Sequence, residues 1–134
     1  MARAAALVGE RWTLLILRAA LYGRTRFDAI QAETGAPRDV LSRRLKRLVG
    51  EELLARRAYR DAGARARAEH LLTDKGRDLS PALLALMEWG DRHLRDDAPP
   101  LAVRSARTGA RLRLALVDED GCAVDPAEAT FELA

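Results

Sequence analysis

The chain has 134 residues, of which 49% are hydrophobic and 32% charged, and its formal net charge is +3. This length and composition are typical of one folded domain with its own core and a short extension. No apolar run approaches the roughly 20 residues of a transmembrane helix, and the apolar N-terminal stretch is too short for a signal peptide. We therefore expect a cytoplasmic protein that has no membrane segment.

A single cysteine, Cys122, restricts the chemistry that the chain can support. One thiol excludes an intramolecular disulfide framework and an all-cysteine zinc cluster within one chain. The sequence also lacks the glycine-rich phosphate-binding and zinc-protease motifs, and its two histidines are 23 positions apart. We therefore expect no catalytic residues, no metal site and no cofactor.

The basic residues are concentrated in one part of the chain. Residues 24–67 contain 12 Lys or Arg against six Asp or Glu, whereas residues 98–134 contain four basic and six acidic residues. A concentrated basic patch favours contact with a polyanion, because neutralised phosphates release their counterions. On charge alone, an arginine-rich face that is merely solvated is an equal alternative.

The first predicted helices are scaffold. The segment WTLLILRAAL, residues 12–21, is almost wholly apolar and precedes Gly23, which favours a buried helix that ends at the glycine. The next segment has Thr25 as a candidate N-cap, two apolar residues three positions apart, and Gly35 as a terminator. This pattern predicts a second helix of about two turns.

A third helix is predicted from Pro37 to about Leu48, because proline suits the first position of a helix. Leucines at 41, 45 and 48 fall on one arc of the helical wheel and must face the core. The opposite face offers donors to base edges and to phosphates. Its candidates for DNA contact are Arg38, Asp39, Ser42, Arg43, Lys46 and Arg47. A short helix, a turn and a helix with this face predict a helix-turn-helix whose second helix enters the major groove.

Two strand-like segments follow, LLARRAYR and RARAEHLLT, separated by the turn signal DAGA. Arginines surround this turn, and we select Arg65 and Arg67 as further candidates for DNA contact. An arginine-tipped ribbon directly after a basic helix is what a DNA-binding wing requires. The alternative is a solvated hairpin.

The segment after the ribbon predicts a long helix over residues 74–97. Thr73 is placed to cap it, and Pro81 is expected to bend or restart it. Its apolar residues recur at helical spacing and exceed what a small domain needs to cover, so we expect a homodimer formed by this helix and the N-terminal helix. The predicted dimerisation residues are Leu79, Leu83, Leu86, Met87, Gly90 and Leu94.

The chain changes character after Pro99 and Pro100, which mark a linker. RLRLALV alternates between polar and apolar residues, and DEDG is a turn signal. ATFEL is expected to pair back with the first segment, so a small β appendage is predicted. A hairpin packed on the dimer is one interpretation of this appendage. An exposed edge strand that contacts another protein is the alternative.

Three ordered blocks of this chain resemble the HxlR-type winged-helix regulators, a branch of the MarR-like group. The blocks are VGERWTLLILRAALYGRTRF, DVLSRRLKRLVGEELLARR and LTDKGRDLSPALLALMEWGDRH, and together they cover roughly residues 5–95. The resemblance implies a homodimer built from the terminal helices. It also implies that residues 37–47 are a recognition helix in the major groove and residues 56–73 a wing that reaches the minor groove.

The chain departs from the family pattern at three places: a cysteine that is missing ahead of the first helix, the wing tip, which is DAGARAR where the family usually has proline, and His70. Many members carry a cysteine just ahead of the first helix, and this chain has none there, so we expect Cys122 to be dispensable for DNA binding. His70 stands where the family's strand usually has tyrosine. A proton switch is the sharper interpretation of His70, and a packed polar residue on a small sheet is the plainer one.

The sequence as a whole predicts a mainly α fold with a small β component. A winged helix-turn-helix domain with a long C-terminal dimerisation helix is expected over residues 1–97, and a linker with a hairpin-like appendage over residues 98–134. The predicted function is a dimeric, sequence-specific regulator of transcription that binds double-stranded DNA. The alternative is a winged-helix module that binds proteins, but such a helix should expose apolar residues at 38–47, where this chain has Arg, Ser and Lys. The operator, the sign of regulation and the existence of a small-molecule effector are left open.

Overall fold

The computed structural model describes residues 1–59 and 67–132. The chain separates into two compact units, Met1–Leu83 and Leu84–Ala134. Within the described residues, none of the helices has the length and apolar character needed to cross a membrane.

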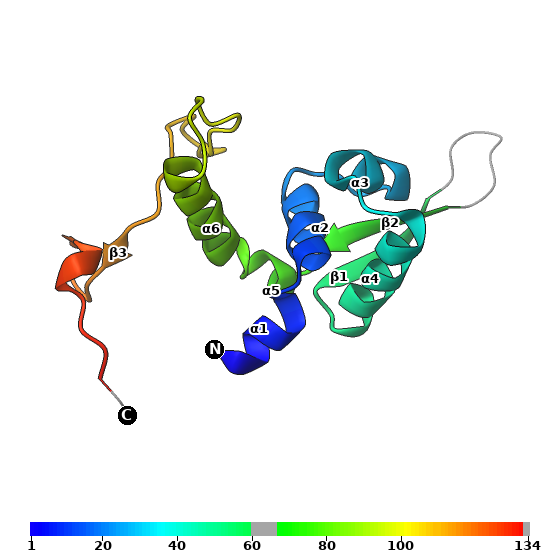
Figure 1. The fold of residues 1–134 in the computed structure, drawn as a ribbon, viewed down its shortest axis with the longest axis horizontal. Coiled ribbons are helices and arrows are strands. Elements are labelled where there is room, and N and C mark those ends of the chain that lie inside the picture. The colour runs from blue at the N-terminus through cyan, green and yellow to red at the C-terminus, as the bar shows by residue number, and fades with distance from the viewer. Residues whose placement is uncertain (60–66, 133–134) are drawn as a thin grey trace. The chain divides into compact units, whose positions relative to one another are not determined.

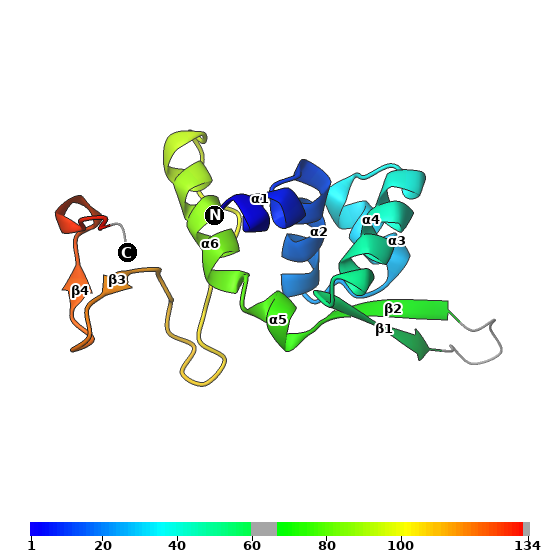
Figure 2. The same cartoon turned by 90° about the horizontal axis from the view of Figure 1, so that it is seen from below.

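The first unit is a group of helices with a two-stranded hairpin beside it (Figures 1 and 2). Its helices are α1 (Ala2–Val8), α2 (Arg11–Leu21), α3 (Phe27–Thr34), α4 (Arg38–Gly50) and the short α5 (Asp74–Arg77). The strands are β1 (Leu54–Tyr59) and β2 (Arg67–Leu72). Helix α6 (Ser80–His93) begins in this unit and continues into the second. The helix-turn-helix followed by a hairpin, predicted from the sequence, is confirmed.

The core of the first unit is built from the apolar faces of three helices and the hairpin. Ile16 and Leu17 of α2 are fully buried, as is Ile30 of α3. The predicted leucine arc of α4 also faces this core, since all three of its leucines are buried. Helix α4 begins at Arg38, with Pro37 as its N-cap, and ends two residues beyond the predicted Leu48.

The start of α3 differs from the sequence prediction. Gly35 ends the helix in the left-handed conformation with φ +68°, as expected for a glycine terminator. Thr25, however, is not the N-cap, because Arg26 holds that position without a side-chain cap. The Thr25 hydroxyl instead donates to Glu69 of β2 at 3.1 Å. The approach of β2, a tertiary contact, therefore overrides the local capping preference.

The hairpin is antiparallel, with Leu54 opposite Leu72 at its base and Tyr59 opposite Arg67 at the far end of the described strands. The opposite edge of β2 pairs with the segment ahead of α3, where the amide of His70 donates to the carbonyl of Thr25 at 2.7 Å. This edge is therefore tied to the helical part of the unit. The predicted DAGA turn and Arg65 lie outside the described residues.

The single long helix predicted over residues 74–97 is two helices. Thr73 caps the first, as predicted, by accepting a hydrogen bond from the amide of Gly76 at 3.0 Å. The second restarts with Pro81 at its second position, where the missing amide hydrogen costs nothing, and ends at His93. Gly76 is required by close packing, because a Cβ built there would overlap the carbonyl oxygen of Leu53.

The second unit carries short strands β3 (Leu116–Val117) and β4 (Ala123–Val124) and a 3-10 turn, η1 (Pro126–Glu128). The two strands form a hairpin around DEDG, as predicted, and Gly121 has a φ of +82° in the turn. The expectation that ATFEL pairs back is wrong for residues 129–132, which carry no strand. Asp125 caps η1 by accepting from the amide of Ala127 at 2.9 Å, and this cap turns the chain out of the β4 direction.

Candidate nucleic-acid interface

Helix α4 has two opposed faces. Leu41, Leu45 and Leu48 are at most 2% exposed and hold one face in the core. The opposite face is exposed at every position that the sequence analysis selected on this helix. Those positions are Arg38, Asp39, Ser42, Arg43, Lys46 and Arg47. Because the leucines fix the rotation of the helix about its axis, they also fix the direction of the polar face.

The basic residues of this face differ in whether they already have a hydrogen-bond or ion-pair partner within the protein. Arg38 donates to two side chains of α3, at 3.3 and 3.0 Å, and Arg47 donates to a backbone carbonyl of α1 at 3.2 Å. Arg43 and Lys46 have no hydrogen-bond or ion-pair partner among the described residues. These two cations are therefore the ones that remain available to an external anion.

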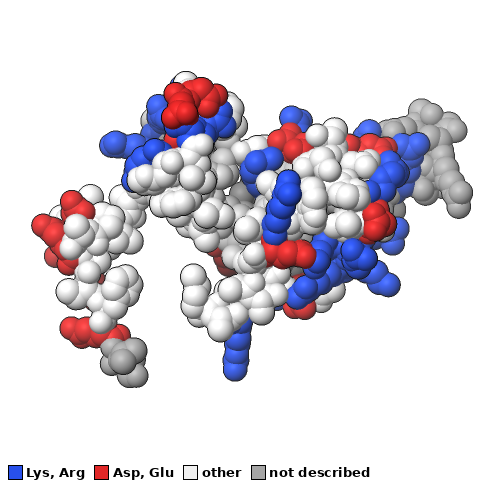
Figure 3. Space-filling model, viewed as in Figure 1, with Lys and Arg blue, Asp and Glu red and all other residues white. Residues whose placement is uncertain are grey.

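Arg44 has a different role from its neighbours. Its side chain is 19% exposed and forms an ion pair with Glu10, the residue just ahead of α2. The pair ties α4 to α2 and removes Arg44 from the outward face. In Figure 3, Lys and Arg side chains lie on both units, and several of those on the first unit lie around its α4 end with acidic side chains between them.

The hairpin adds exposed arginines beside α4. Arg67, at the start of β2, is exposed as predicted, and Arg56 of β1 is exposed as well. Neither has a hydrogen-bond or ion-pair partner among the described residues. Arg57 is engaged, because its guanidinium donates to Glu69 at 2.7 Å. Arg65 cannot be placed, since it lies outside the described part of the chain.

Glu69 fixes the hairpin to the helices. Its carboxylate accepts from Arg57 across the hairpin and from Thr25 ahead of α3. The hydrogen bond from Arg57 is the main cause that holds the pKa of Glu69 below its ordinary value, with Thr25 and the nearby charge of Arg26 acting in the same direction. A carboxylate held in this way orients the hairpin relative to α3 and α4.

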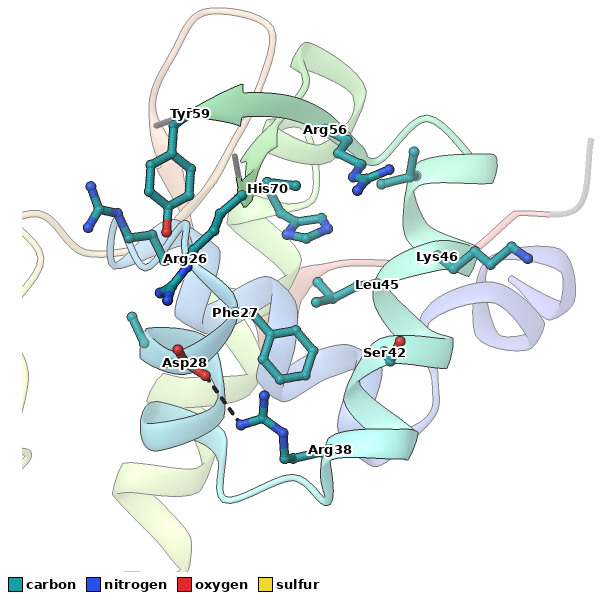
Figure 4. A pocket seen from close by; sticks show the side chains of 14 residues that line it. Arg26, Phe27, Asp28, Arg38, Ser42, Leu45, Lys46, Arg56, Tyr59 and His70 are labelled. Carbon is teal, nitrogen blue, oxygen red and sulfur yellow. Dashed lines mark hydrogen bonds and ion pairs between the residues drawn. The ribbon is translucent and has the colours of Figure 1, made fainter. Parts of the chain in front are cut away.

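A groove of about 880 Å³ separates α4 from the hairpin, with the start of α3 closing one end (Figure 4). Its lining residues are Arg26, Phe27, Asp28, Ala29, Arg38, Ser42, Leu45, Lys46, Val49, Arg56, Tyr59, Arg67, Ala68 and His70. Two of its guanidinium groups stack on aromatic rings, Arg26 over Tyr59 at 4.3 Å and Arg38 over Phe27 at 4.9 Å. Five lining residues are cationic and one is acidic, so the groove favours anions.

His70 lies in the wall of this groove and is 9% exposed. Burial, with a smaller contribution from the charge of Arg56, holds the pKa of His70 below its ordinary value, so the ring is neutral at pH 7. Its Nδ1 atom is buried and has no hydrogen-bond partner among the described residues. The structure therefore agrees with the plainer interpretation, a packed polar residue, and adds an unpaired ring nitrogen.

The groove brings together residues that the sequence analysis selected and residues that it missed. Arg38, Ser42, Lys46 and Arg67 were selected, whereas Arg26, Arg56 and the aromatic residues were not. Arg56 stands opposite His70 in the strand register, so the pairing of the two strands is the signal that could have found it. No local pattern places Arg26 there, because its position depends on how α3 meets β2.

The predicted dimerisation residues are divided between two environments. Leu83 is 6% exposed and belongs to the core of the first unit, and Leu79 packs against that core. Leu86 and Leu94 are exposed at 51% and 72%, as is Trp89 at 52%. Met87 and Gly90 have intermediate exposure. The exposed members of the set are the ones available to a second chain.

No group of three or more His, Cys, Asp or Glu side chains capable of holding a metal ion occurs within residues 1–59 and 67–132. Cys122 is exposed and carries a free thiol.

A buried three-helix core, an outward polar face on the second helix of the helix-turn-helix and an antiparallel hairpin beside it define a winged helix-turn-helix protein. Comparison with known proteins narrows this class. The model of the HxlR-like helix-turn-helix family matches residues 7–98, which is more than half of the chain. The chain belongs to this family.

Sequence and structure relatives agree with this assignment. An uncharacterized HTH-type transcriptional regulator of Mycobacterium tuberculosis H37Rv is 46% identical over 108 residues, which are 80% of this chain and 67% of the relative. The crystal structure of PA1607, a candidate transcription factor, has a TM-score of 0.81 and 28% identity over 98% of this chain and 92% of that one. PA1374 of Pseudomonas aeruginosa, also a candidate transcription factor, has a TM-score of 0.66 and 31% identity over 98% and 90% of the two chains.

Proposed function

We propose that the protein is a homodimeric transcriptional regulator that binds double-stranded DNA sequence-specifically, with α4 in the major groove and the hairpin at the minor groove. The observation that carries this proposal is the outward face of α4, which is exposed and polar while the opposite face is locked into the core. Membership of the HxlR-like helix-turn-helix family and relatives named as transcriptional regulators, not enzymes, support it.

Within α4, we assign different roles to the exposed residues. Ser42 and Arg43 lie at the centre of the outward face, where side chains reach base edges, and an arginine can make a bidentate contact to guanine. Lys46 and Arg47 lie later on the helix and are assigned to phosphates. The free state of Arg43 supports its role, because no ion pair within the described residues has to break before it meets a base.

The wing is assigned to residues 56–73, with Arg67 and Arg65 against the DNA backbone. Arg67 is exposed and has no partner in the described part of the chain. The hairpin is tied to the segment ahead of α3 through Glu69, in the middle of β2, and Thr25. This tie supports the assignment, because a wing that is oriented before binding loses less conformational entropy when it meets DNA.

The surface of the second unit supports a homodimer. None of its described residues is buried within the single chain. Its exposed large apolar residues are Leu86, Trp89, Leu94, Leu101, Leu112, Leu114, Leu116, Val117 and Phe131. This much exposed apolar surface marks an interaction site, and a second copy is the simplest partner for it. We therefore propose that residues 98–134 form an appendage to a DNA-binding and dimerisation domain, 1–97.

A winged-helix module that docks proteins through α4 is less well supported. Such a helix would present large apolar side chains at the centre of its exposed face. None of the exposed large hydrophobic residues in the described part of the chain belongs to α4. The chemistry of the face therefore favours a polyanion over a protein groove.

Selection of bound sequences from random duplex DNA at fixed physiological salt tests the proposal. We expect a two-fold-related consensus, because a symmetric dimer places two recognition helices on related half-sites. Arg43→Ala should lose the consensus at one base position, and Arg107→Ala, an exposed arginine of the second unit, should keep it. A folded dimer that enriches no consensus would favour the protein-binding module.

A further inference from the structure

We propose that residues 125–132 of one chain dock into a groove beside α6 of a second copy, with Phe131 as the anchor, and that two copies exchange these segments reciprocally. The inference rests on the proposed homodimer and adds the segment and the groove through which the two copies contact each other. Three features carry it: an apolar groove with unpaired arginines, an exposed aromatic side chain in an acidic segment, and the division of charge between the two.

The groove lies within the second unit, between α6 and residues 99–113. Its volume is about 290 Å³. Sites that enclose a whole small ligand are typically about 300–1,000 Å³, so this groove suits one large side chain. Its larger apolar lining residues are Leu84, Met87, Leu101, Val103 and Leu112. An apolar side chain is therefore the expected occupant of its floor.

The charged residues of the groove are only partly paired. Glu88 accepts a hydrogen bond from the amide of Leu114 at 3.4 Å, and the carboxylate of Asp91 lies 3.9 Å from the guanidinium of Arg95. The three lining arginines are exposed and have no hydrogen-bond or ion-pair partner among the described residues. They are Arg92, Arg111 and Arg113. An occupant that carries carboxylates beside an apolar group would satisfy them.

The strand pairing beside the groove also favours an acidic occupant. Arg104 and Arg111 stand opposite each other in an isolated antiparallel bridge, and like charges in such a position destabilise a strand pair. Arg104 donates to the carbonyl of Gly109 at 3.0 Å, whereas Arg111 has no partner in the described part of the chain. A carboxylate bound beside Arg111 would relieve this repulsion.

Phe131 has the complementary character. Its side chain is 99% exposed, so the single chain leaves the whole ring in water. It lies in the segment DPAEATFE, residues 125–132, between Glu128 and Glu132. Aromatic side chains are frequent anchors of protein interfaces, especially where a pocket on the partner receives them. A phenyl ring flanked by carboxylates matches a groove with an apolar floor and free arginines on its rim.

The charges of the second unit are divided along the chain. Residues 99–113 contain four arginines and no acidic residue, whereas residues 118–132 contain six acidic residues and no Lys or Arg. Two copies can match each basic stretch with the acidic segment of the other, so a two-fold exchange forms every contact twice. Duplex DNA fits the groove poorly, because two carboxylates line it and its floor is apolar.

The exchange uses a different face of α6 from the proposed contact between helices. The groove-lining residues of α6 recur at positions 84, 87, 88 and 91, which form one stripe of the helix. Leu86 and Trp89, both about half exposed, lie on the opposite side. Helix α6 can therefore contact a second copy while its groove receives the segment. Each contact holds the other at high effective concentration.

Photo-crosslinking of the full chain tests where Phe131 lies. The photoreactive residue p-benzoylphenylalanine replaces Phe131, and the protein is made in ¹⁴N and ¹⁵N forms that are mixed and allowed to exchange subunits. We expect crosslinks from position 131 to the groove, Met87 included, in peptide pairs that combine the two isotopes. Crosslinks that never combine the isotopes would place the segment on its own chain. That result, or crosslinks that miss the groove, would overturn the exchange.

Variants of both partners test the energetics by analytical ultracentrifugation. Phe131→Ser should raise the dimer dissociation constant by at least about tenfold, because each dimer loses two buried rings. Arg111→Glu should also raise it, and adding Glu132→Arg should recover most of the loss. Arg107→Glu, at an exposed arginine outside the groove lining, is the control and should stay within about twofold of wild type. An unchanged Phe131→Ser dimer, or a double variant weaker than Arg111→Glu alone, would refute the exchange.

Failure of the exchange and failure of the proposed function give different results. A dimer that binds its selected operator but shows no crosslink from position 131 to a second copy refutes the exchange alone. A wild-type chain that stays monomeric refutes the homodimer and the exchange together. A crosslinked dimer that selects no DNA sequence refutes the regulator and leaves the exchange standing. Loss of operator binding by an Arg111→Glu variant with unchanged dimerisation would assign the groove to DNA and overturn the exchange.

Discussion

Glu69 of β2 accepts a hydrogen bond from the hydroxyl of Thr25 at 3.1 Å, and this contact joins the hairpin to the segment that leads into α3. The two residues are 44 positions apart in the chain. With the backbone bond from the amide of His70 to the carbonyl of Thr25, the contact sets the direction in which the hairpin leaves the helices. Any DNA contact made by the wing depends on that direction.

The first prediction concerns the charge of Glu69. Glu69→Gln removes the ion pair with Arg57, so the hairpin amides should exchange hydrogen faster and DNA should bind more weakly. Because the pKa of Glu69 is lowered in the folded state, its stabilising effect is full above the ordinary carboxyl pKa of about 4.3 and is lost as the pH falls through the lowered value. The free energies of unfolding of the wild type and of Glu69→Gln, measured in urea, should therefore become equal at acid pH.

Glu51→Gln is the control for this prediction, because Glu51 is exposed and its side chain has no partner in the described residues. It should match the wild type at every pH. A stability difference between Glu69→Gln and wild type that stays constant down to strongly acid pH would show that the carboxylate charge has no part in the attachment.

The second prediction separates reading of bases from attraction to phosphates on α4. Arg43→Ala should weaken binding to the selected operator by about 1–3 kcal/mol, the value of a good bidentate base contact, and should affect scrambled DNA much less. Lys46→Ala should weaken both kinds of binding alike. Anisotropy titrations against the two duplexes measure the difference. Equal losses for Arg43→Ala on both duplexes would move sequence reading away from this helix.

The third prediction concerns the salt dependence of wing contacts. Arg67→Ala, and likewise Arg65→Ala, should reduce the slope of log affinity against log salt by about one unit per lost phosphate contact, or about two in a symmetric dimer. The base preference should not change. Affinities at several salt concentrations supply the slope, and the assignment to the DNA backbone fails if Arg67→Ala alters the consensus instead.

The fourth prediction concerns the dimer. Leu86→Glu should raise the dimer dissociation constant by at least about 100-fold, because each dimer loses two buried leucines worth about 1.5–3 kcal/mol each. Analytical ultracentrifugation measures it. Ala85→Glu, on an exposed neighbouring position of α6, is the control and should remain dimeric. Leu83 is unsuitable for this test, because its side chain is 6% exposed in the core of the single chain and a charge there would unfold the first unit.

The fifth prediction concerns close packing behind the hairpin. Gly76→Ala should destabilise the protein by about 1–3 kcal/mol, the usual cost of overpacking, because its Cβ would overlap the backbone oxygen of Leu53. Gly50→Ala, at the end of α4, meets nothing within 4 Å and should be neutral or stabilising by up to about 1 kcal/mol. Thermal unfolding of the two variants side by side checks both values, and equal stabilities would contradict the packing argument.

Local patterns were sufficient for most of the helical framework. The leucines of α4 recur at helical spacing, so the sequence determined which face is buried and therefore which face exposes Ser42 and Arg43. Gly35 and Pro81 act on the backbone directly, through a left-handed terminator and a missing amide hydrogen, and the structure places both at the helix boundaries that this predicts. Each of these signals depends on residues within one or two turns of one another.

Only the tertiary structure decided which distant side chains meet. Thr25 has the chemistry of an N-cap, but the approach of β2 gives its hydroxyl a carboxylate partner instead. Leu83 shares the spacing of its exposed neighbours on α6, yet lies in the core because the helix leaves that core within its first turn or so. The groove likewise depends on strand register and helix packing, which bring Arg56 and His70 of the hairpin into one lining with Lys46 of α4. Periodicity constrains each element separately, whereas the free energy of packing between elements decides which of their faces come together.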